Sequence, residues 1–154
     1  MSKTCCFTGH RSIAPQELKA VTVETANAIV SMIERGVDTF LSGGAVGFDL
    51  LAARLILRAK DTYPQIKLKM VLPCRDQTAK WGRSDRAMYE LVLSQADEIE
   101  YTSETYHRGC MLLRNRRMAD QSDFCIAYLT HSGGGTAYTV DYCNTHGVEV
   151  RLVP

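Results

Sequence analysis

Strand-like runs alternate with helix-like segments along the whole chain of 154 residues, and this alternation limits the fold more than any other feature. Short apolar runs end at Gly, Ser or Pro, and each is followed by a segment with apolar residues at helical spacing. Strands joined through helices pair in parallel, with right-handed crossovers that cover both faces of a sheet. The sequence therefore predicts an α/β fold, a three-layer Rossmann-like doubly wound sheet of about six mostly parallel strands.

The boundaries follow from the same pattern. The expected strands cover residues 3–7, 38–41, 67–72, 98–101, 124–128 and 148–153, and the expected helices cover 18–36, 50–60, a segment from Ser84, 106–120 and a segment from Ser132 to Gly147. A long loop at 73–82 has the length typical of functional loops. With 45% hydrophobic residues the chain can bury one core, so we expect a single domain over 1–154.

Two glycine-rich segments follow expected strands, Ser42-Gly43-Gly44-Ala45-Val46-Gly47-Phe48-Asp49 and Gly133-Gly134-Gly135-Thr136. In a doubly wound sheet the ligand crevice lies outside the carboxyl ends of the strands, so both segments should share one rim with Thr8 and Gly9. Glycine lets the backbone approach a ligand, and the helix that follows offers free N–H groups to phosphate. One such segment is equally explained as a tight turn, but two on one rim favour a nucleotide-derived ligand.

The spacing of these glycines argues against the commonest nucleotide sites. Neither segment has the dinucleotide pattern Gly-x-Gly-x-x-Gly, and no Gly-Lys-Ser/Thr P-loop occurs. The sequence therefore disfavours an ordinary NAD dehydrogenase or an ATPase.

Several polar side chains near these segments have two interpretations. Arg11 is expected to bind phosphate, whereas His10 either contacts ligand or is satisfied by backbone. Asp49 either accepts a ribose hydroxyl or only interacts with the helix dipole, and Thr136 is an N-cap or a phosphate ligand. The run Arg114-Asn115-Arg116-Arg117 is either an anion-steering surface or a solvated helix face.

An ordered set of motifs resembles one family. The set comprises Thr8-Gly9-His10-Arg11, the segment from Ser42 to Asp49, Pro73 with Gln77 and Trp81, Arg114-Asn115, Met118, Ser122-Asp123, and Gly133-Gly134-Gly135-Thr136-Ala137-Tyr138-Thr139. It is similar to the YpsA-like branch of the SLOG superfamily over nearly the whole chain. The resemblance implies a Rossmann-like fold that binds a nucleotide, or an ADP-ribose or NAD-related ligand, in a sensing or regulatory setting, with no cofactor required and no established reaction.

The resemblance and the glycine segments together give a candidate ligand-binding set. Its members are Thr8, Gly9, His10, Arg11, Ser42, Gly43, Gly44, Ala45, Gly47, Asp49, Gln77, Trp81, Arg114, Asn115, Gly133, Gly134, Gly135, Thr136 and Thr139. We expect Trp81 either to stack on a base or to pack beneath its loop.

Two alternatives come from other SLOG members. The LOG phosphoribohydrolases carry Pro-Gly-Gly-x-Gly-Thr-x-x-Glu, and the catalytic Glu position falls on Thr139. A hydroxyl cannot replace that carboxylate, so N-glycosidic cleavage would need Asp49 or Asp141 instead, and no catalytic residue is assigned. The DNA-processing protein DprA offers the second alternative, single-stranded DNA binding, but the net charge of +1 argues against a nucleic-acid partner.

Composition limits the remaining possibilities. The apolar run near the N-terminus is too short for a signal peptide and no stretch has the length of a membrane span, so we expect a cytoplasmic protein with no membrane partner. The six cysteines have no Cys-x-x-Cys or Cys/His zinc spacing, which predicts reduced thiols and no metal site. The expected partner is a nucleotide-derived small molecule, and the sequence leaves open a homo-oligomer or a protein partner.

Overall fold

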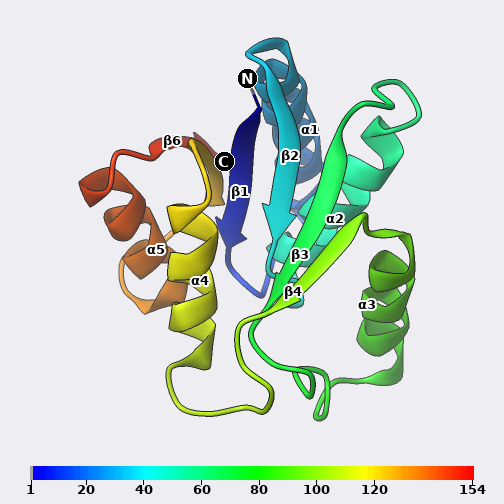
Figure 1. The fold of residues 1–154 in the computed structure, drawn as a ribbon, viewed down its shortest axis with the longest axis vertical. Coiled ribbons are helices and arrows are strands. Elements are labelled where there is room, and N and C mark those ends of the chain that lie inside the picture. The colour runs from blue at the N-terminus through cyan, green and yellow to red at the C-terminus, as the bar shows by residue number, and fades with distance from the viewer. Residues whose placement is uncertain (1) are drawn as a thin grey trace.

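The computed structural model describes residues 2–154 as strands and helices in strict alternation (Figure 1). In chain order they are β1 (Lys3–Gly9), α1 (Leu18–Glu34), β2 (Val37–Ser42), α2 (Phe48–Ala59), β3 (Lys67–Leu72), α3 (Arg83–Gln95), β4 (Glu98–Tyr101), α4 (Cys110–Asp120), β5 (Phe124–Tyr128), α5 (Gly134–Thr145) and β6 (Glu149–Val153). The predicted α/β alternation is confirmed, with most boundaries within a few residues.

The six strands form one sheet in the order β4-β3-β2-β1-β5-β6, and every neighbouring pair is parallel. The chain moves outward from β1 to β4 and then returns to the other side of β1 for β5 and β6. Strand order therefore reverses between β1 and β5, where a doubly wound sheet forms its ligand crevice. The predicted Rossmann-like class is confirmed.

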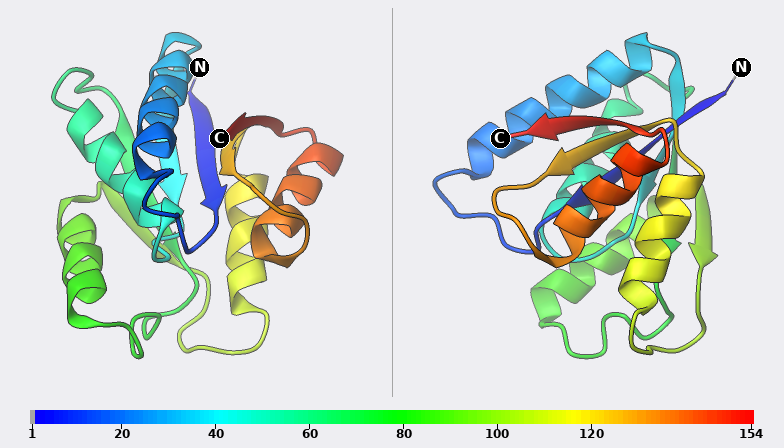
Figure 2. Two further views of the ribbon diagram at one scale, coloured as in Figure 1. Left: turned by 180° about the vertical axis from the view of Figure 1, so that it is seen from behind. Right: turned by 90° about the vertical axis from the view of Figure 1, so that its left-hand side faces the viewer.

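Helices cover both faces of the sheet, giving three layers (Figure 2). α1, α2 and α3 lie on one face and enclose an apolar cluster that includes Phe7, Phe40 and Phe48. α4 and α5 lie on the other face over a second cluster. Because strand side chains alternate, the neighbours Cys5 and Cys6 enter different clusters. Burial of each large apolar side chain stabilises the fold by roughly 1.5–3 kcal/mol.

Two helix starts differ from the prediction. α4 begins at Cys110 rather than at residue 106, because Gly109 adopts a left-handed φ of 85° and the N–H of Tyr106 donates to Asp76 Oδ1 instead of entering a helix. The N-cap of α5 is Gly133, so Thr136 lies inside the first turn and the N-cap interpretation of that residue is wrong.

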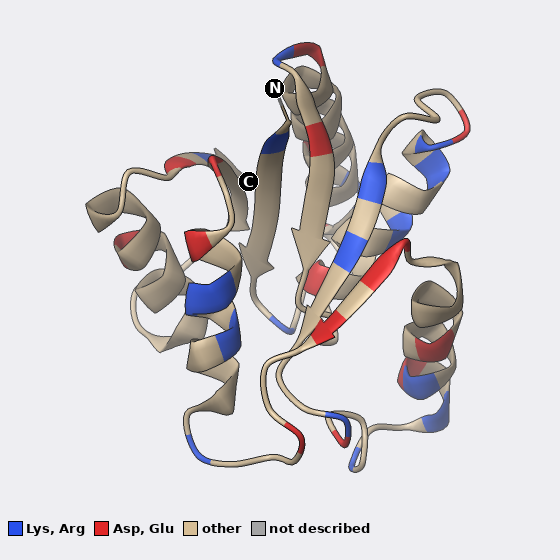
Figure 3. Ribbon diagram, viewed as in Figure 1, with Lys and Arg blue, Asp and Glu red and all other residues tan. Residues whose placement is uncertain are grey.

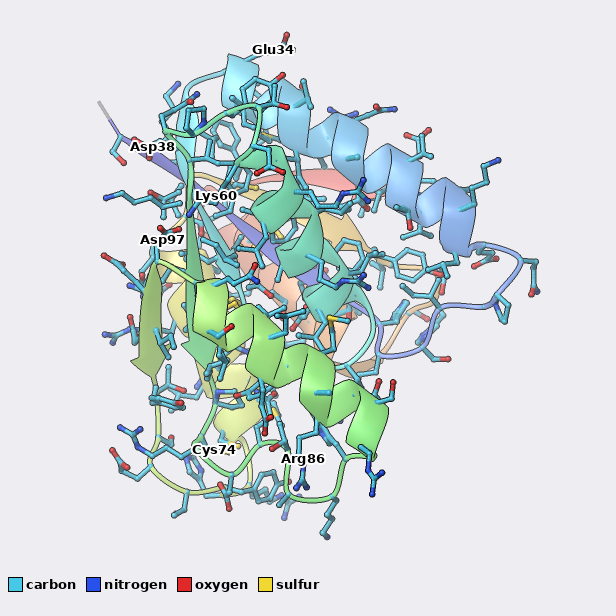
Figure 4. All side chains as sticks on the ribbon, turned by 90° about the vertical axis from the view of Figure 1, so that its right-hand side faces the viewer. Glu34, Asp38, Lys60, Cys74, Arg86 and Asp97 are labelled. Carbon is cyan, nitrogen blue, oxygen red and sulfur yellow. The ribbon has the colours of Figure 1, made fainter. Side chains whose placement is uncertain are left out.

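Near the amino ends of β3 and β4, Lys60 at the end of α2 forms an ion pair with Asp97, at 2.6 Å (Figure 4). Asp97 also accepts a hydrogen bond from the backbone N–H of Leu68 at 2.8 Å. The pair is partly exposed and contributes at most about 1 kcal/mol. Over residues 2–154, the helices are all too short or too polar to cross a membrane.

Candidate functional site

A cavity of about 370 Å³ lies at the carboxyl ends of β1 and β5, where strand order reverses. Its volume falls in the range of small-molecule sites. The lining comes from the end of β1, the turn before α2, the side of α4 and the start of α5. The lining residues are Thr8, Gly9, His10, Arg11, Ala45, Asp49, Met111, Leu112, Arg114, Asn115, His131, Gly133, Gly134, Gly135 and Thr136.

The start of α5 is the open side of this cavity. Gly133 and Gly134 have positive φ angles of 83° and 82°, and a Cβ atom on either would meet no described atom within 4 Å. A Cβ on Gly135 would reach Leu112 and Asn115 only at ordinary contact distances of 3.9 and 4.0 Å. Within residues 2–154, no side chain caps the helix. The first N–H groups of α5 and the positive end of its dipole can therefore bind an anion.

The glycine turn before α2 is built differently, because its own side chains accept its N–H groups. The N–H of Gly44 donates to Ser42 Oγ and the N–H of Ala45 donates to Asp49 Oδ2, both at 3.3 Å. The N–H of Phe48 donates to the carbonyl oxygen of His10 at 3.1 Å. This turn supplies Ala45 to the cavity wall and the first turn of α2 supplies Asp49, whereas α5 supplies free backbone N–H groups.

Four small residues of that turn pack against other segments and lie outside the lining of the first cavity, namely Ser42, Gly43, Gly44 and Gly47. A Cβ on Gly47, whose φ is 87°, would overlap the carbonyl oxygen of Arg11, and a Cβ on Gly43 would overlap the guanidinium of Arg114. A Cβ on Gly44 would lie 2.9 Å from Leu72 Cδ2. Ser42 is fully buried and donates to the carbonyl oxygen of Asp49 at 2.8 Å. These four positions need small residues so that three segments can meet.

Two buried charged residues lie in the cavity wall. Arg114 and Asp49 are only 3% and 6% exposed. Burial raises the pKa of Asp49, while the charge of Arg114 and the N–H of Ala45 oppose that rise. Burial likewise lowers the pKa of Arg114, and Asp49 opposes that change. Of the two interpretations of the basic run on α4, the solvated face describes the exposed Arg117, whereas Arg114 is a buried residue of the cavity wall.

Two histidines stack at the rim. The rings of His10 and His131 lie 4.1 Å apart between centroids at an angle of 11°. His10 Nε2 accepts a hydrogen bond from the N–H of Thr130 at 2.9 Å, so His10 lines the cavity and is also satisfied by backbone. Burial, and then the charge of His131, lower the pKa of His10, which favours the neutral ring. His131 is absent from the predicted set, although its place just after the strand at 124–128 was a signal for it.

Gln77 and Trp81 lie in an adjoining cavity of about 490 Å³, which shares Arg11 and Met111 with the first. Gln77 is 8% exposed and its Nε2 donates to the hydroxyl of Tyr89 at 3.3 Å, while its Oε1 has no hydrogen-bond partner within residues 2–154. Trp81 is half-buried and meets the ring of Tyr89 edge-on at 5.3 Å. The second cavity is lined by Arg11, Asp76, Gln77, Ala79, Lys80, Trp81, Tyr106 and Met111.

Arg86 braces the loop that carries these two residues (Figure 4). Its Nη2 donates to the carbonyl oxygens of Thr78 and Ala79 at 2.9 and 3.2 Å. The loop at 73–82 is therefore held against α3, which positions Gln77 and Trp81 beside the first cavity.

Thr139 lies on α5 outside the cavity lining. It is 1% exposed, and its Oγ1 donates to the carbonyl oxygen of Gly135 at 2.8 Å. Asp141 is exposed and also lies outside the lining, so among residues 2–154 the only carboxylate in the cavity wall belongs to Asp49. The hydroxyl of Thr139 completes a helical turn.

Comparisons with known proteins identify the family and the fold of the chain. The model of the YspA SLOG family (YpsA) matches residues 5–149, which confirms the expected resemblance to the YpsA-like branch of the SLOG superfamily. The UPF0398 protein BH1768 of Halalkalibacterium halodurans is 29% identical over 116 residues; the match covers 73% of this chain and 61% of that protein. The chain thus spans less than two thirds of that relative's length.

Two solved structures of DNA processing protein A have the same fold. The Helicobacter pylori protein, described by its single-stranded DNA binding mode, superposes with a TM-score of 0.71 at 19% identity, covering 99% of this chain and 65% of its own. The Streptococcus pneumoniae protein gives 0.72 at 17% identity, covering 99% and 50%. Identities this low extend only the fold to this chain.

Proposed function

The chain belongs to the YspA SLOG family, and from this premise we propose that it binds a nucleotide or nucleotide-derived ligand, of the ADP-ribose or NAD kind, in a sensing or regulatory role. One observation carries the proposal. The uncapped amino end of α5 opens onto the cavity at the strand-order reversal, and exposed Arg11 lies on the same wall. Backbone N–H groups at a helix start and a guanidinium are the donors that phosphate oxygens prefer.

The adjoining cavity supports a ligand with more than a phosphate end. Arg11 and Met111 belong to both cavities, so one extended molecule can pass between them. The second cavity offers Trp81 and the exposed ring of Tyr106 to a planar base, and the amide of Gln77 to its polar edge. A ligand with its phosphate in the first cavity and its base in the second would be a nucleoside diphosphate derivative.

The chemistry of the wall favours binding over N-glycosidic cleavage. LOG-type cleavage uses a glutamate at the position of Thr139, whose hydroxyl is already donated to Gly135. Asp49 lies in the wall, but its carboxylate accepts the N–H of Ala45 and faces the charge of Arg114. We therefore expect incubation with nucleoside monophosphates to release little free base by chromatography. Turnover near one per second, an ordinary enzymatic rate, would assign a hydrolase instead.

Single-stranded DNA binding is the second candidate, favoured by the likeness to DNA processing protein A. Against it, basic and acidic residues alternate over the side of the molecule that Figure 3 shows, where the acidic strand β4 lies beside the basic strand β3. Glu100 accepts from both Lys69 and Arg117, at 3.0 and 2.8 Å, which removes two cations from a potential phosphate surface. A gel shift that weakens steeply with salt would support DNA binding.

A thermal-shift panel tests the proposal directly. ADP-ribose, NAD, AMP and cyclic nucleotides are compared with bare nucleosides and with inorganic phosphate. Because a ligand that binds only the folded state raises the melting temperature, we expect at least one nucleotide derivative to raise it more than its nucleoside. A panel with no shift at millimolar concentration, alongside a shift by an unrelated compound class, would refute the assignment.

A further inference from the structure

Three cysteine side chains from separate elements meet between the sheet and the helices α4 and α5. Cys6 lies on β1, Cys125 is its register partner on β5, and Cys143 lies on α5. Their Sγ atoms all lie within 4.8 Å of one another, and each residue is 0% exposed. All three are free thiols, so each sulfur is available as a ligand. Spacing in the sequence cannot reveal this cluster, because Cys6 lies on the first strand, far along the chain from Cys125 on β5 and Cys143 on α5.

The distances suit one three-coordinate ion. With a bond of about 2.3 Å to each sulfur, a three-coordinate ion holds its sulfur ligands about 4 Å apart when planar and closer when pyramidal, and both fall within the 4.8 Å that bounds the Sγ–Sγ distances. In residues 2–154 no His, Asp or Glu joins the group. Structural zinc takes four ligands, so an ion that is complete with three sulfurs fits this set better.

The surroundings of the cluster select the charge of the ion. The apolar cluster around the sulfurs contains Leu41, Val71, Met118, Ala127 and Val140. Three thiolates carry three negative charges, and a net charge in such a medium is strongly unfavourable. A monovalent ion leaves a net charge of −2 and a divalent ion leaves −1. A trivalent ion leaves none.

We propose that Cys6, Cys125 and Cys143 form a binding site for a trivalent thiophilic ion of the arsenite and antimonite class. Arsenous acid, As(OH)₃, has three As–OH bonds, and each is replaced by an As–S bond to one cysteine. Each replacement releases one water, made from the departing hydroxide and the thiol proton, so charge is conserved and no oxidant is needed. The bound ion joins α5 to β1 and β5, and this inference does not depend on the nucleotide proposal.

The test measures arsenic retained by the reduced full-length chain. The chain is loaded with equimolar arsenite both in its native state and during refolding, since the sulfurs are fully buried, and is then desalted. We expect one arsenic per chain by elemental analysis, and an intact mass that gains one arsenic and loses three hydrogens. Retention by neither preparation would overturn the site, and a loss of only two hydrogens would overturn its three-sulfur composition.

Cys5→Ala and Cys6→Ala form a matched pair, because the two residues are neighbours on β1, equally buried, and face opposite sides of the sheet. Cys5→Ala should bind arsenite like the wild type. Cys6→Ala should bind at least about tenfold more weakly, a loss typical of a disturbed metal site. Cys143→Ala, with Cys110→Ala as control, repeats the comparison if circular dichroism shows Cys6→Ala unfolded. Equal retention within both pairs would refute the proposal, and zinc retained as tightly as arsenite would refute its charge argument.

Discussion

Nη1 of Arg114, on α4, donates a hydrogen bond at 2.5 Å to the carbonyl oxygen of Gly43, 71 residues earlier in the chain. Nε of the same guanidinium donates to Asn115 Oδ1 at 2.7 Å. This contact fixes the helix on one face of the sheet against the turn that leads to the other face. The cavity floor therefore depends on a buried cation, whose charge favours the ionised form of the buried Asp49.

Replacing Arg114 by Met should destabilise the fold strongly. Methionine keeps an unbranched apolar stem, but the buried carboxylate of Asp49 loses the stabilising charge of Arg114 and the carbonyl oxygen of Gly43 loses its donor, a combined loss of about 3–5 kcal/mol. Urea unfolding measures the loss, with Arg117→Met as a matched control on the exposed face, where we expect less than about 1 kcal/mol. Adding Asp49→Asn to Arg114→Met should restore part of the stability. A double variant no more stable than the single one would contradict the coupling.

Asp49 also predicts a pH dependence of stability. Burial raises the pKa of Asp49, so the folded state holds its proton to higher pH than the unfolded state does. The stabilisation that comes from this difference is complete below the ordinary pKa of an aspartate, about 3.9, and it is lost as pH rises through the raised pKa of the folded state. Asp49→Asn removes this term and keeps an acceptor for the N–H of Ala45. The variant should therefore gain stability relative to the wild type as pH rises through that window, and a pH-independent difference in unfolding free energy would contradict the assignment.

Arg11→Ala separates binding from folding. Arg11 is exposed, so its loss should leave the unfolding midpoint almost unchanged. A charge-assisted contact to phosphate is worth about 1.5–3 kcal/mol, so affinity for the panel's best nucleotide should fall tenfold or more. Calorimetry at low ionic strength measures it, and Arg58→Ala, an exposed position at the far end of α2, is the control. Wild-type affinity in Arg11→Ala would move the site elsewhere.

Gly135→Ala tests the backbone of α5 without disturbing the fold. The new Cβ meets Leu112 and Asn115 at ordinary contact distances, and Ala favours a helix over Gly by roughly 0.5–1 kcal/mol. We therefore expect a slightly more stable protein that binds the nucleotide more weakly, because a methyl group intrudes where phosphate approaches. Gly47→Ala should instead damage the fold, since its Cβ overlaps Arg11. Unchanged affinity in a folded Gly135→Ala variant would exclude the start of α5 as the phosphate site.

Sequence patterns predicted the fold well because alternation and parallel crossovers leave few topologies. They also brought Gly9, Asp49 and Gly134 to one rim, since strand ends define that edge. They did not separate the two glycine segments, whose difference lies in hydrogen bonds from the turn before α2 to Ser42 and Asp49.

The sequence also did not predict which polar residues are buried. Arg114 and Arg117 belong to one basic run, and only helix packing decides that the first is buried and the second exposed. Cys6 and Cys125 likewise meet through strand register, and Cys143 joins them because α5 packs on the sheet, neither of which spacing along the chain encodes.

Trp81 reports on the second cavity, because it is the only tryptophan of the chain. Its indole is half-buried and packs edge-on against Tyr89, with one side lining the cavity beside Arg11. A base that stacks on the indole should quench its fluorescence or shift its emission, and the titration should give the affinity measured by calorimetry. In Arg11→Ala the same change should need about tenfold more ligand, since phosphate contact and base stacking belong to one molecule. Saturating nucleotide that leaves intensity and wavelength unchanged would mean that Trp81 only packs beneath its loop and that the base lies outside the second cavity.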